Sequence, residues 1–375
     1  MGPAWGANCP RALRWPPIHS QGVSPSQPGR VDSRCATPHQ RRRRLRCLPE
    51  QSLWDGGIAG ERICTALGIA HVHTPHSLGI WKHRQMLPDY PGDSAALERK
   101  YDFRARNLQE RRIASMANLL IATTPDQKDC LEKDYDLPLK KLALIPPGYD
   151  DTRFYPVGSD TRALLRRKFG FEGKVILSLG RIARNKGYDL LVRAFAEVAS
   201  RDPAARLHLA IGGERLQAAE EAILGGWREL VNELGLSSRV SFSGFVPDAD
   251  IADLYRAADV FVLSSRYEPF GMAAVEAMAC GTPAVVTIHG GLFRVLRFGI
   301  DGLFADTFDP MDLAITILKP LQYPRIAARL GRCGAETARR LFTWGGARRA
   351  CFGRPSGSGT RILARSRIRE CVGLI

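Results

Sequence analysis

The chain has 375 residues, of which 45% are hydrophobic and 25% are charged, and its formal net charge is +16. This length favours two domains, and the ordinary hydrophobic fraction excludes a fully disordered chain. No uncharged apolar run of about 18 or more residues occurs, and the N-terminus lacks the apolar core of a secretory signal, so we expect a soluble, cytoplasmic protein. The nine cysteines contain no C-x-x-C pair, which argues against a zinc site and a disulfide framework.

The N-terminal segment 1–53 differs in composition from the middle of the chain. Residues 1–55 hold nine Arg, three acids and no Lys, and they include the block RRRRLR. Because helical and strand periodicity are both absent, we predict that the segment is atypical and disordered. The basic block could bind phosphates, RNA or a membrane surface, and an Arg-rich start with few acids is also typical of an organelle transit peptide. We rank these roles below a disordered or artefactual segment.

Short β-branched runs alternate with helical patterns through the middle of the chain. The strand-like runs are IAHVHTPHS, NLLIATT and KLALIPPG, then KVILSLG, RLHLAIGG, RVSFSG, DVFVLSS, TPAVVT and GLFAD. Helical patterns such as YDLLVRAFAEVAS and DADIADLYRAA separate several of them. This alternation predicts an α/β fold with parallel sheets, whose ligands bind at the carboxyl ends of the strands. The segment Pro146–Gly158, rich in Pro, Gly and Asp, is the predicted linker.

The segment LSLGRIARNKG places two cations after a predicted strand. The strand ends at Gly180, and Arg181 and Lys186 follow in a turn. The planar fork of arginine and the point charge of lysine both suit a diphosphate. Taken alone, the segment fits a diphosphate site and a pair of solvated surface charges equally well.

The segment RYEPFGMAAVEAMACGTPAVVT carries two glutamates on either side of a small apolar stretch. The turn Pro269–Gly271 leads into a predicted helix that begins near Met272, and the free N–H groups of its first turn would bind an anion. Glu276 could accept two hydrogen bonds from a ribose diol, and Glu268 could accept one from a sugar hydroxyl. The alternatives are a helix-dipole partner, worth about 0.3–1 kcal/mol, for Glu276 and a solvated loop acid for Glu268.

Taken together, GRIARNKG, GFVPDADIADLYRAADVFVLSSRYEPFGMAAVEAMACGTPAVVT and the E-x(7)-E spacing of Glu268 and Glu276 resemble family 4 retaining glycosyltransferases. Upstream, HVHTPHSLGIWKHRQM, ATTPDQ and IPPGYDDTRFYPVG resemble the sucrose-phosphate synthase branch, and within it the mannosylfructose-phosphate synthases most closely. The resemblance covers Trp54–Trp344. It implies the GT-B fold, in which two Rossmann-like domains face a cleft, here with an incomplete N-terminal domain.

The resemblance also implies a division of the chain. Residues 54–150 would form a partial N-terminal acceptor-binding Rossmann-like domain, and residues 151–344 a C-terminal nucleotide-sugar-binding Rossmann-like domain. The first strand and glycine-rich loop of family members are not recognisable in residues 1–53, and an atypical Arg-rich tail, 345–375, replaces the helices that relatives have there. These departures suggest a fragmentary or frameshifted family member whose acceptor domain is damaged.

The activity that the resemblance implies is hexosyl transfer with retention. The favoured reaction moves mannose from GDP-mannose to fructose 6-phosphate, by front-face attack of the acceptor hydroxyl, and it requires neither a metal nor another cofactor. One alternative is a sucrose-phosphate synthase-like enzyme that uses UDP-glucose. Another is a catalytically impaired protein that only binds sugar nucleotides. Nucleic-acid binding by the basic ends is a further, less favoured hypothesis, and no membrane partner is expected.

The resemblance assigns roles to individual residues. Arg181 and Lys186 would hold the donor diphosphate and neutralise the charge that develops on it. Glu276 would bind the nucleotide ribose, and Glu268 the donor hexose. His76 would contact the transferred hexose near its anomeric carbon.

The acceptor phosphate would be bound by Lys82 and Arg106, since two cations near a cleft suit a phosphate. Family members commonly have a second arginine where this chain has Ala105, which weakens this assignment. The full predicted donor-binding set is Gly180, Arg181, Lys186, Glu268, Pro269, Phe270, Gly271, Met272, Ala273 and Glu276. The predicted catalytic set is His76, Arg181, Lys186 and Glu268.

Overall fold

The computed structural model describes residues 47–52, 54–89 and 93–344 of the chain. The RRRRLR block and the Arg-rich tail lie outside the described residues, as do the predictions made for them. No helix of the described part is long and apolar enough to cross a membrane.

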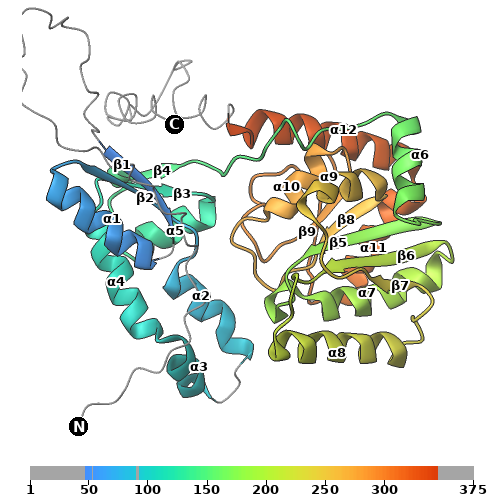
Figure 1. Cartoon of the computed structure of the whole chain (residues 1–375), viewed down its shortest axis with the longest axis horizontal. Coiled ribbons are helices and arrows are strands. Elements are labelled where there is room, and N and C mark those ends of the chain that lie inside the picture. The colour runs from blue at the N-terminus through green and yellow to red at the C-terminus, as the bar shows by residue number, and fades with distance from the viewer. Residues whose placement is uncertain (1–46, 53, 90–92, 345–375) are drawn as a thin grey trace, which may run out of the picture. The chain divides into compact units, whose positions relative to one another are not determined.

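Among the described residues, the smaller sheet has four parallel strands in the order β1-β2-β3-β4 (Figure 1). These are β1 (Cys47–Ser52), β2 (Ala70–Pro75), β3 (Leu119–Ala122) and β4 (Leu142–Leu144). The last three match predicted runs. β1 departs from the expectation of disorder through residue 53, and its sequence CLPEQS gave no signal because it has no β-branched residue and contains a proline.

The helices between residues 54 and 141 accompany the four-stranded sheet. They are α1 (Trp54–Leu67), α2 (Gly79–Met86), α3 (Ser94–Tyr101), α4 (Phe103–Met116) and α5 (Pro125–Lys133), with the 3-10 turns η1 (Leu87–Asp89) and η2 (Leu139–Lys141). Leu78, just before α2, is buried in one apolar cluster with Ala114 of α4, Leu120 of β3 and Leu131 of α5. This cluster fixes the loop that follows β2.

The larger sheet has six parallel strands within the described residues, in the order β10-β9-β8-β5-β6-β7. They are β5 (Lys174–Gly180), β6 (Ala205–Ile211), β7 (Val240–Phe242), β8 (Val260–Leu263), β9 (Ala284–Thr287) and β10 (Leu303–Ala305). The chain proceeds outward from β5 to β7 and then returns to β8, on the other side of β5. The topological switch point, where such sheets bind ligands, therefore lies between β5 and β8.

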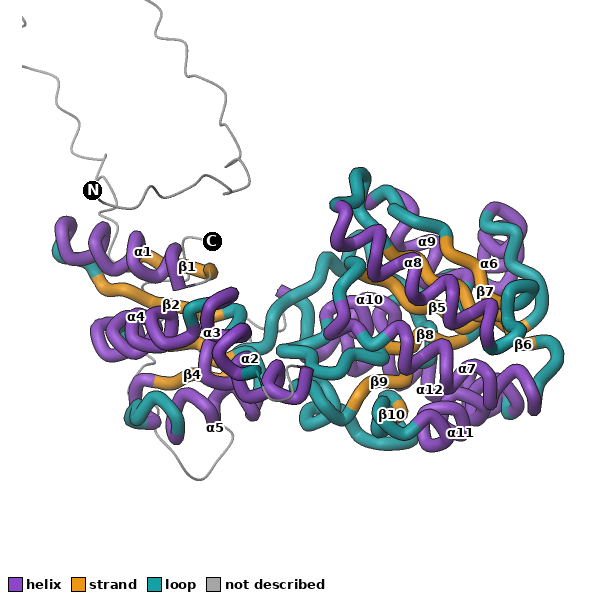
Figure 2. The backbone as a smooth tube through the Cα atoms, turned by 90° about the horizontal axis from the view of Figure 1, so that it is seen from below, coloured by secondary structure: helices purple, strands orange, loops and turns teal. Residues whose placement is uncertain are grey.

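Helices cover both faces of this sheet (Figure 2). They are α7 (Tyr188–Arg201), α8 (Ala218–Glu233), α9 (Asp248–Ala257), α10 (Met272–Ala279), α11 (Pro310–Gln322) and α12 (Pro324–Leu341). Val260 and Val262 of β8 belong to the cluster that contains α7, α8 and α11, whereas Phe261 and Leu263 belong to the one that contains α9 and α10. Burial on both faces is typical of parallel strands, so the parallel α/β fold expected from the sequence is confirmed.

The predicted linker Pro146–Gly158 packs against the larger half. Tyr149 and Phe154 are buried in the apolar cluster that contains α9 and α10. The Arg256 guanidinium of α9 donates hydrogen bonds to the carbonyls of Arg153 at 2.8 Å and Tyr155 at 3.0 Å.

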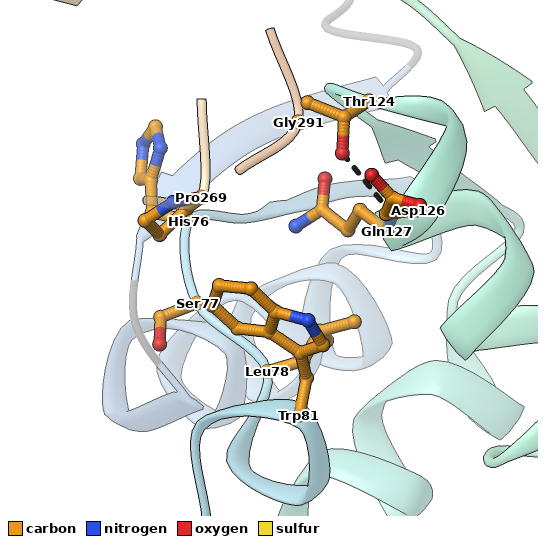
Figure 3. A pocket seen from close by; sticks show the side chains of 9 residues that line it. All are labelled: His76, Ser77, Leu78, Trp81, Thr124, Asp126, Gln127, Pro269 and Gly291. Carbon is orange, nitrogen blue, oxygen red and sulfur yellow. Dashed lines mark hydrogen bonds between the residues drawn. The ribbon is translucent and has the colours of Figure 1, made fainter. Parts of the chain in front are cut away.

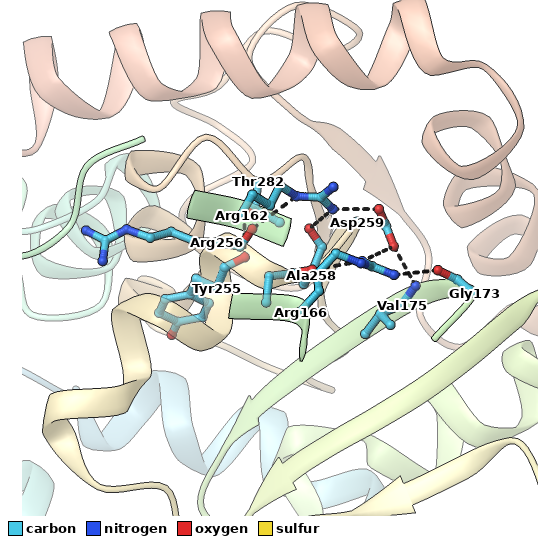
Figure 4. Close-up of polar contacts among 10 residues, drawn as sticks. Arg162, Arg166, Gly173, Val175, Tyr255, Arg256, Ala258, Asp259 and Thr282 are labelled. Carbon is cyan, nitrogen blue, oxygen red and sulfur yellow. Dashed lines mark hydrogen bonds and ion pairs between the residues drawn. The ribbon is translucent and has the colours of Figure 1, made fainter. Parts of the chain in front are cut away.

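Asp259, just before β8, anchors the helix α6 (Ser159–Lys168) to this sheet (Figure 4). Its two carboxylate oxygens accept from Arg162 Nη2 at 2.6 Å and Arg166 Nη1 at 2.9 Å. The backbone N–H of Val175 donates to Asp259 Oδ2 at 2.7 Å. One carboxylate therefore accepts hydrogen bonds from two guanidinium groups of α6 and from a backbone N–H at the start of β5.

We expect the substitution Asp259→Ala to lower the free energy of unfolding by about 2–3 kcal/mol, because two guanidinium groups lose their carboxylate partner and the Val175 N–H loses its acceptor. Chemical denaturation of the purified chain measures this. The matched control is Asp250→Ala, which removes an exposed partner of Lys168 at 2.7 Å and should cost far less. Equal losses in the two variants would contradict the anchoring role.

Candidate functional site

The loops that follow β5 and β8 meet at the switch point. The first loop contains η3 (Arg184–Lys186), and its Lys186 carbonyl accepts from Ser264 Oγ at 3.0 Å. The Arg266 N–H donates to the Asn185 carbonyl at 2.8 Å. Gly187 ends η3 with φ 63°, and a Cβ there would lie 2.1 Å from the Ser264 carbonyl oxygen. Only glycine fits this approach, so the two loops form one block.

Two predicted donor-site residues pair directly within this block. Lys186 Nζ donates to Glu268 Oε2 at 2.7 Å, and Ser265 Oγ donates to the same oxygen at 3.0 Å. Glu268 is 9% exposed, and such a buried carboxylate needs these donors to offset the loss of hydration. The sequence predicted both charged residues but not their pairing, and it gave no signal for Ser265.

The helix α10 begins at Met272, as predicted, directly after this block. Its N-cap is Gly271, with φ 108°, and no side chain caps the first turn. The N-terminal N–H groups of α10 thus lie next to Glu268 and Lys186, where they favour an anion. Phe270 is buried against Phe342, with 5.6 Å between ring centroids, so its side chain belongs to the core.

Glu276 lies about one turn into α10 and accepts a hydrogen bond from the hydroxyl of Tyr255 at 3.2 Å. Burial raises the pKa of Glu276, and the Tyr255 hydrogen bond and the charge of Arg153 partly offset this rise. Tyr255, a fully buried residue of α9, was not predicted as a site residue. Nothing in its local sequence distinguishes it from an ordinary core tyrosine.

His76 directly follows β2 and is exposed, and it lines a pocket with an empty volume of about 330 Å³ (Figure 3). The pocket is lined by His76, Ser77, Leu78, Trp81, Thr124, Asp126, Gln127, Pro269 and Gly291. His76 and Pro269 were predicted site residues. Trp81, Thr124 and Gln127 were not, although the motifs HSLGIWK and ATTPDQ contain them.

The predicted acceptor cations lie close to a predicted donor cation. Burial lowers the pKa of Lys82, and the positive charges of Arg106 and Arg181 lower it further. A bound anion would offset this repulsion between positive charges. Part of the Arg106 guanidinium is already bonded, since its Nη2 donates to the Ser77 carbonyl oxygen at 3.0 Å and Oγ at 3.2 Å.

Two family models match the chain. One, described as glycosyl transferases group 1, matches residues 162–337, and the other, described as glycosyltransferase family 4, matches residues 34–153. The second match begins upstream of Trp54, where the sequence motifs place the start of the resemblance. It therefore includes β1.

Three known proteins illustrate the similarity. Mannosylfructose-phosphate synthase from Agrobacterium fabrum is 57% identical over 293 residues, which are 78% of this chain and 64% of that protein. D-inositol 3-phosphate glycosyltransferase from Corynebacterium jeikeium is 34% identical over 78% of this chain and 67% of that protein. The structure of sucrose-phosphate synthase from Thermosynechococcus elongatus aligns with a TM-score of 0.68 and 31% identity, over 80% of this chain and 71% of that one.

The chain thus spans slightly less than two thirds of the first of these relatives. Its two parallel sheets and their structural likeness to sucrose-phosphate synthase establish the GT-B fold. From the identity and coverage shared with these enzymes, we conclude that the chain belongs to the group 1, family 4 glycosyltransferases.

Proposed function

We propose that the chain is a retaining hexosyltransferase that moves mannose from GDP-mannose to fructose 6-phosphate. The observation that carries this proposal is the block at the switch point, where Lys186, Glu268 and the start of α10 lie together. An ammonium, a sugar-binding carboxylate and a helix N-terminus are the groups that a nucleotide sugar requires. The name of the 57% identical relative supports the choice of mannose and of a fructose phosphate acceptor.

In this proposal Arg181 and Lys186 bind the donor diphosphate. Negative charge grows on the diphosphate as the bond to the anomeric carbon breaks. Two cations at this place stabilise that charge more in the transition state than in the ground state, and this difference accelerates the reaction. The backbone N–H groups of Gly271 and Met272 add donors at the same place.

Glu268 and Glu276 bind the two sugars of the donor. Glu268 accepts from a hydroxyl of the mannose, and its ion-pair partner Lys186 binds the diphosphate. Glu276 accepts two hydrogen bonds from the ribose diol, and Tyr255 holds its carboxylate in place. Glu268 lies in the loop before α10 and Glu276 lies in α10 itself, so this segment orients the two sugars while the loop after β5 binds the diphosphate.

The acceptor binds on the side of the smaller sheet. Lys82 and Arg106 bind its phosphate, and His76 contacts the transferred hexose near the anomeric carbon. The acceptor hydroxyl attacks the anomeric carbon from the face that the diphosphate leaves, and its proton passes to the departing phosphate oxygen. A new C–O bond forms as the old one breaks, on the same face, so the configuration is retained.

The proposal also assigns one substrate to each domain. Residues 54–150 form the acceptor-binding part and residues 151–344 the nucleotide-sugar-binding part, and both substrates are small molecules. Since nucleotide sugars and sugar phosphates are cytoplasmic metabolites, the proposal places the activity in the cytoplasm. It invokes neither a metal nor another cofactor.

The test is a coupled assay of the purified chain with GDP-mannose or UDP-glucose and fructose 6-phosphate, with Glu276→Ala as the control. We expect a phosphorylated disaccharide from GDP-mannose, and loss of product in the variant. Product from UDP-glucose alone would indicate the sucrose-phosphate synthase-like reaction instead. Nucleotide binding without product from either donor would identify a donor-binding protein that is not a transferase.

The raised pKa of Glu276 predicts that nucleotide affinity depends on pH. The ionised carboxylate accepts the ribose hydrogen bonds, so we expect GDP affinity to fall on acidification, with a midpoint above the ordinary glutamate value of 4.5. The substitution Tyr255→Phe removes a bond that lowers this pKa and should move the midpoint higher. Calorimetric titration of GDP across this pH range measures both, and a midpoint below 4.5 would contradict the account.

The same pKa has a consequence for stability. The folded state binds a proton to Glu276 more tightly than the unfolded state does, so its contribution to stability decreases as pH rises from the unfolded pKa to the folded one. Nucleotide affinity rises over the same interval. Function and stability therefore depend on pH in opposite directions at this residue.

A further inference from the structure

Glu110 of α4 is a buried carboxylate that has no part in the roles above. It is 7% exposed and accepts hydrogen bonds from three donors. Arg106 Nε donates to Oε1 at 2.7 Å, the Gly79 N–H donates to Oε2 at 2.7 Å, and the Tyr135 hydroxyl also donates to Oε2. One carboxylate thus connects α4 with the start of α2 and with the loop after α5.

Glu110 supplies the N-terminal cap that α2 lacks in its own sequence. The N-cap residue is Leu78, whose side chain cannot accept a hydrogen bond, so the first N–H groups need other partners. Glu110 accepts from Gly79, and the Tyr135 hydroxyl oxygen accepts from Ile80 at 3.4 Å. A negative charge at this end of the helix is also favoured by the helix dipole.

The same carboxylate fixes the loop that carries His76. Glu110 orients the Arg106 guanidinium, whose Nη2 in turn donates to both oxygens of Ser77, the residue after His76. The loop is therefore bonded on both sides of Leu78, at Ser77 through Arg106 and at Gly79 directly. Lys82 lies one turn into the helix that this loop begins.

We propose that Glu110 is a positioning residue for the acceptor side of the site, which holds the loop 76–79 and the Arg106 guanidinium in the arrangement that binds the sugar phosphate. Its kinetic consequence rests on the proposed transferase function, whereas the order that it gives to the loop does not. Glu110 touches neither substrate in this account. It acts through Arg106, His76 and Lys82.

The substitution Glu110→Gln tests the proposal because all three partners of Glu110 are donors. An amide has one acceptor and one donor group, so its NH₂ must face a donor, and at least one of the three bonds is lost: the bond from Arg106 in one orientation, or those to Oε2 in the other. We expect the KM for fructose 6-phosphate to rise about tenfold or more, while the Kd for GDP changes by less than about twofold. Amide hydrogen exchange over residues 76–86 should become faster.

Two further variants show whether the effect is specific to Glu110 and its hydrogen bonds. Glu61→Gln is the matched control, because Glu61 is also buried and accepts from Arg112 of the same helix at 2.9 Å, but on the side of α1. It should leave the KM and the exchange of residues 76–86 unchanged. Tyr135→Phe removes one donor to Glu110 and the long hydrogen bond from Ile80, but leaves the bonds to Gly79 and Arg106, and it should produce a smaller change in the same direction as Glu110→Gln.

An unchanged KM together with unchanged exchange in Glu110→Gln would overturn the proposal, as would an equal rise in KM in Glu61→Gln. If the unsubstituted chain forms no product, the transferase function fails. The exchange rates of residues 76–86 would then decide by themselves whether Glu110 orders the loop.

Discussion

The variant Lys186→Ala should lose about 100- to 1000-fold in kcat/KM, the range found when one group that stabilises transition-state charge is removed. Two effects combine in this variant. The diphosphate loses a cation, and Glu268, which is buried and paired with Lys186 at 2.7 Å, keeps only the hydrogen bond from Ser265 among the bonds to its Oε2. Steady-state kinetics with GDP-mannose and fructose 6-phosphate measure the loss.

The matched control for Lys186→Ala is Lys174→Ala, at the opposite end of β5. Lys174 forms a similar ion pair, with Asp202 at 2.7 Å, but lies at the start of the strand instead of at its carboxyl end. We expect this control to retain nearly full activity. Comparable losses in the two variants would show that the effect comes from stability and not from the site.

The variant Gly271→Ala should lose both stability and donor binding. Gly271 has φ 108°, and a non-glycine residue in such a conformation costs about 1–3 kcal/mol. A Cβ there would also lie 2.8 Å from Cδ2 of Leu263, a buried residue at the end of β8. Either the Leu263 side chain or the start of α10 must therefore move, and the strained φ acts directly on the start of α10 and its N–H groups. Thermal unfolding and GDP titration measure the two effects.

The control variant Gly170→Ala separates the cost of backbone strain from the loss of geometry at the donor site. Gly170 has φ 64°, and a Cβ there would meet nothing within 4 Å. This control should lose stability from backbone strain but keep its affinity for GDP. If Gly271→Ala bound GDP as tightly as the unsubstituted chain, the start of α10 would not be part of the donor site.

The sequence was sufficient to predict the larger sheet because its strands are short apolar runs with clear boundaries. β8 and α10 are the best case, since the run DVFVLSS and the turn before Met272 have separate and unambiguous signals. β1 was missed because its pairing with β2, from Cys47 with Ala70 to Ser52 with Pro75, compensates for weak local preference. Tertiary context decides such strands.

The site was predictable to the extent that its residues lie in contiguous motifs. Lys186 and Glu268 each stand in such a motif, yet they are 82 positions apart, and no local pattern indicates that they pair. The same holds for Tyr255, which bonds the predicted residue Glu276 from another helix. Glu110 stands four residues after Arg106 in the same helix, a spacing that allows the pair, but the sequence does not show that Glu110 also bonds the start of α2. A single buried polar residue on a helix gives no signal until the fold shows what it contacts.

The central claim is that the carboxyl ends of β5 and β8 form a nucleotide-sugar site, and calorimetric titration of GDP tests it most directly. We expect the unsubstituted chain to bind GDP, and Glu276→Ala to bind it at least about tenfold more weakly, through the loss of two hydrogen bonds to a charged group. Binding that is equally tight in the variant, or no binding by either protein, would contradict the account.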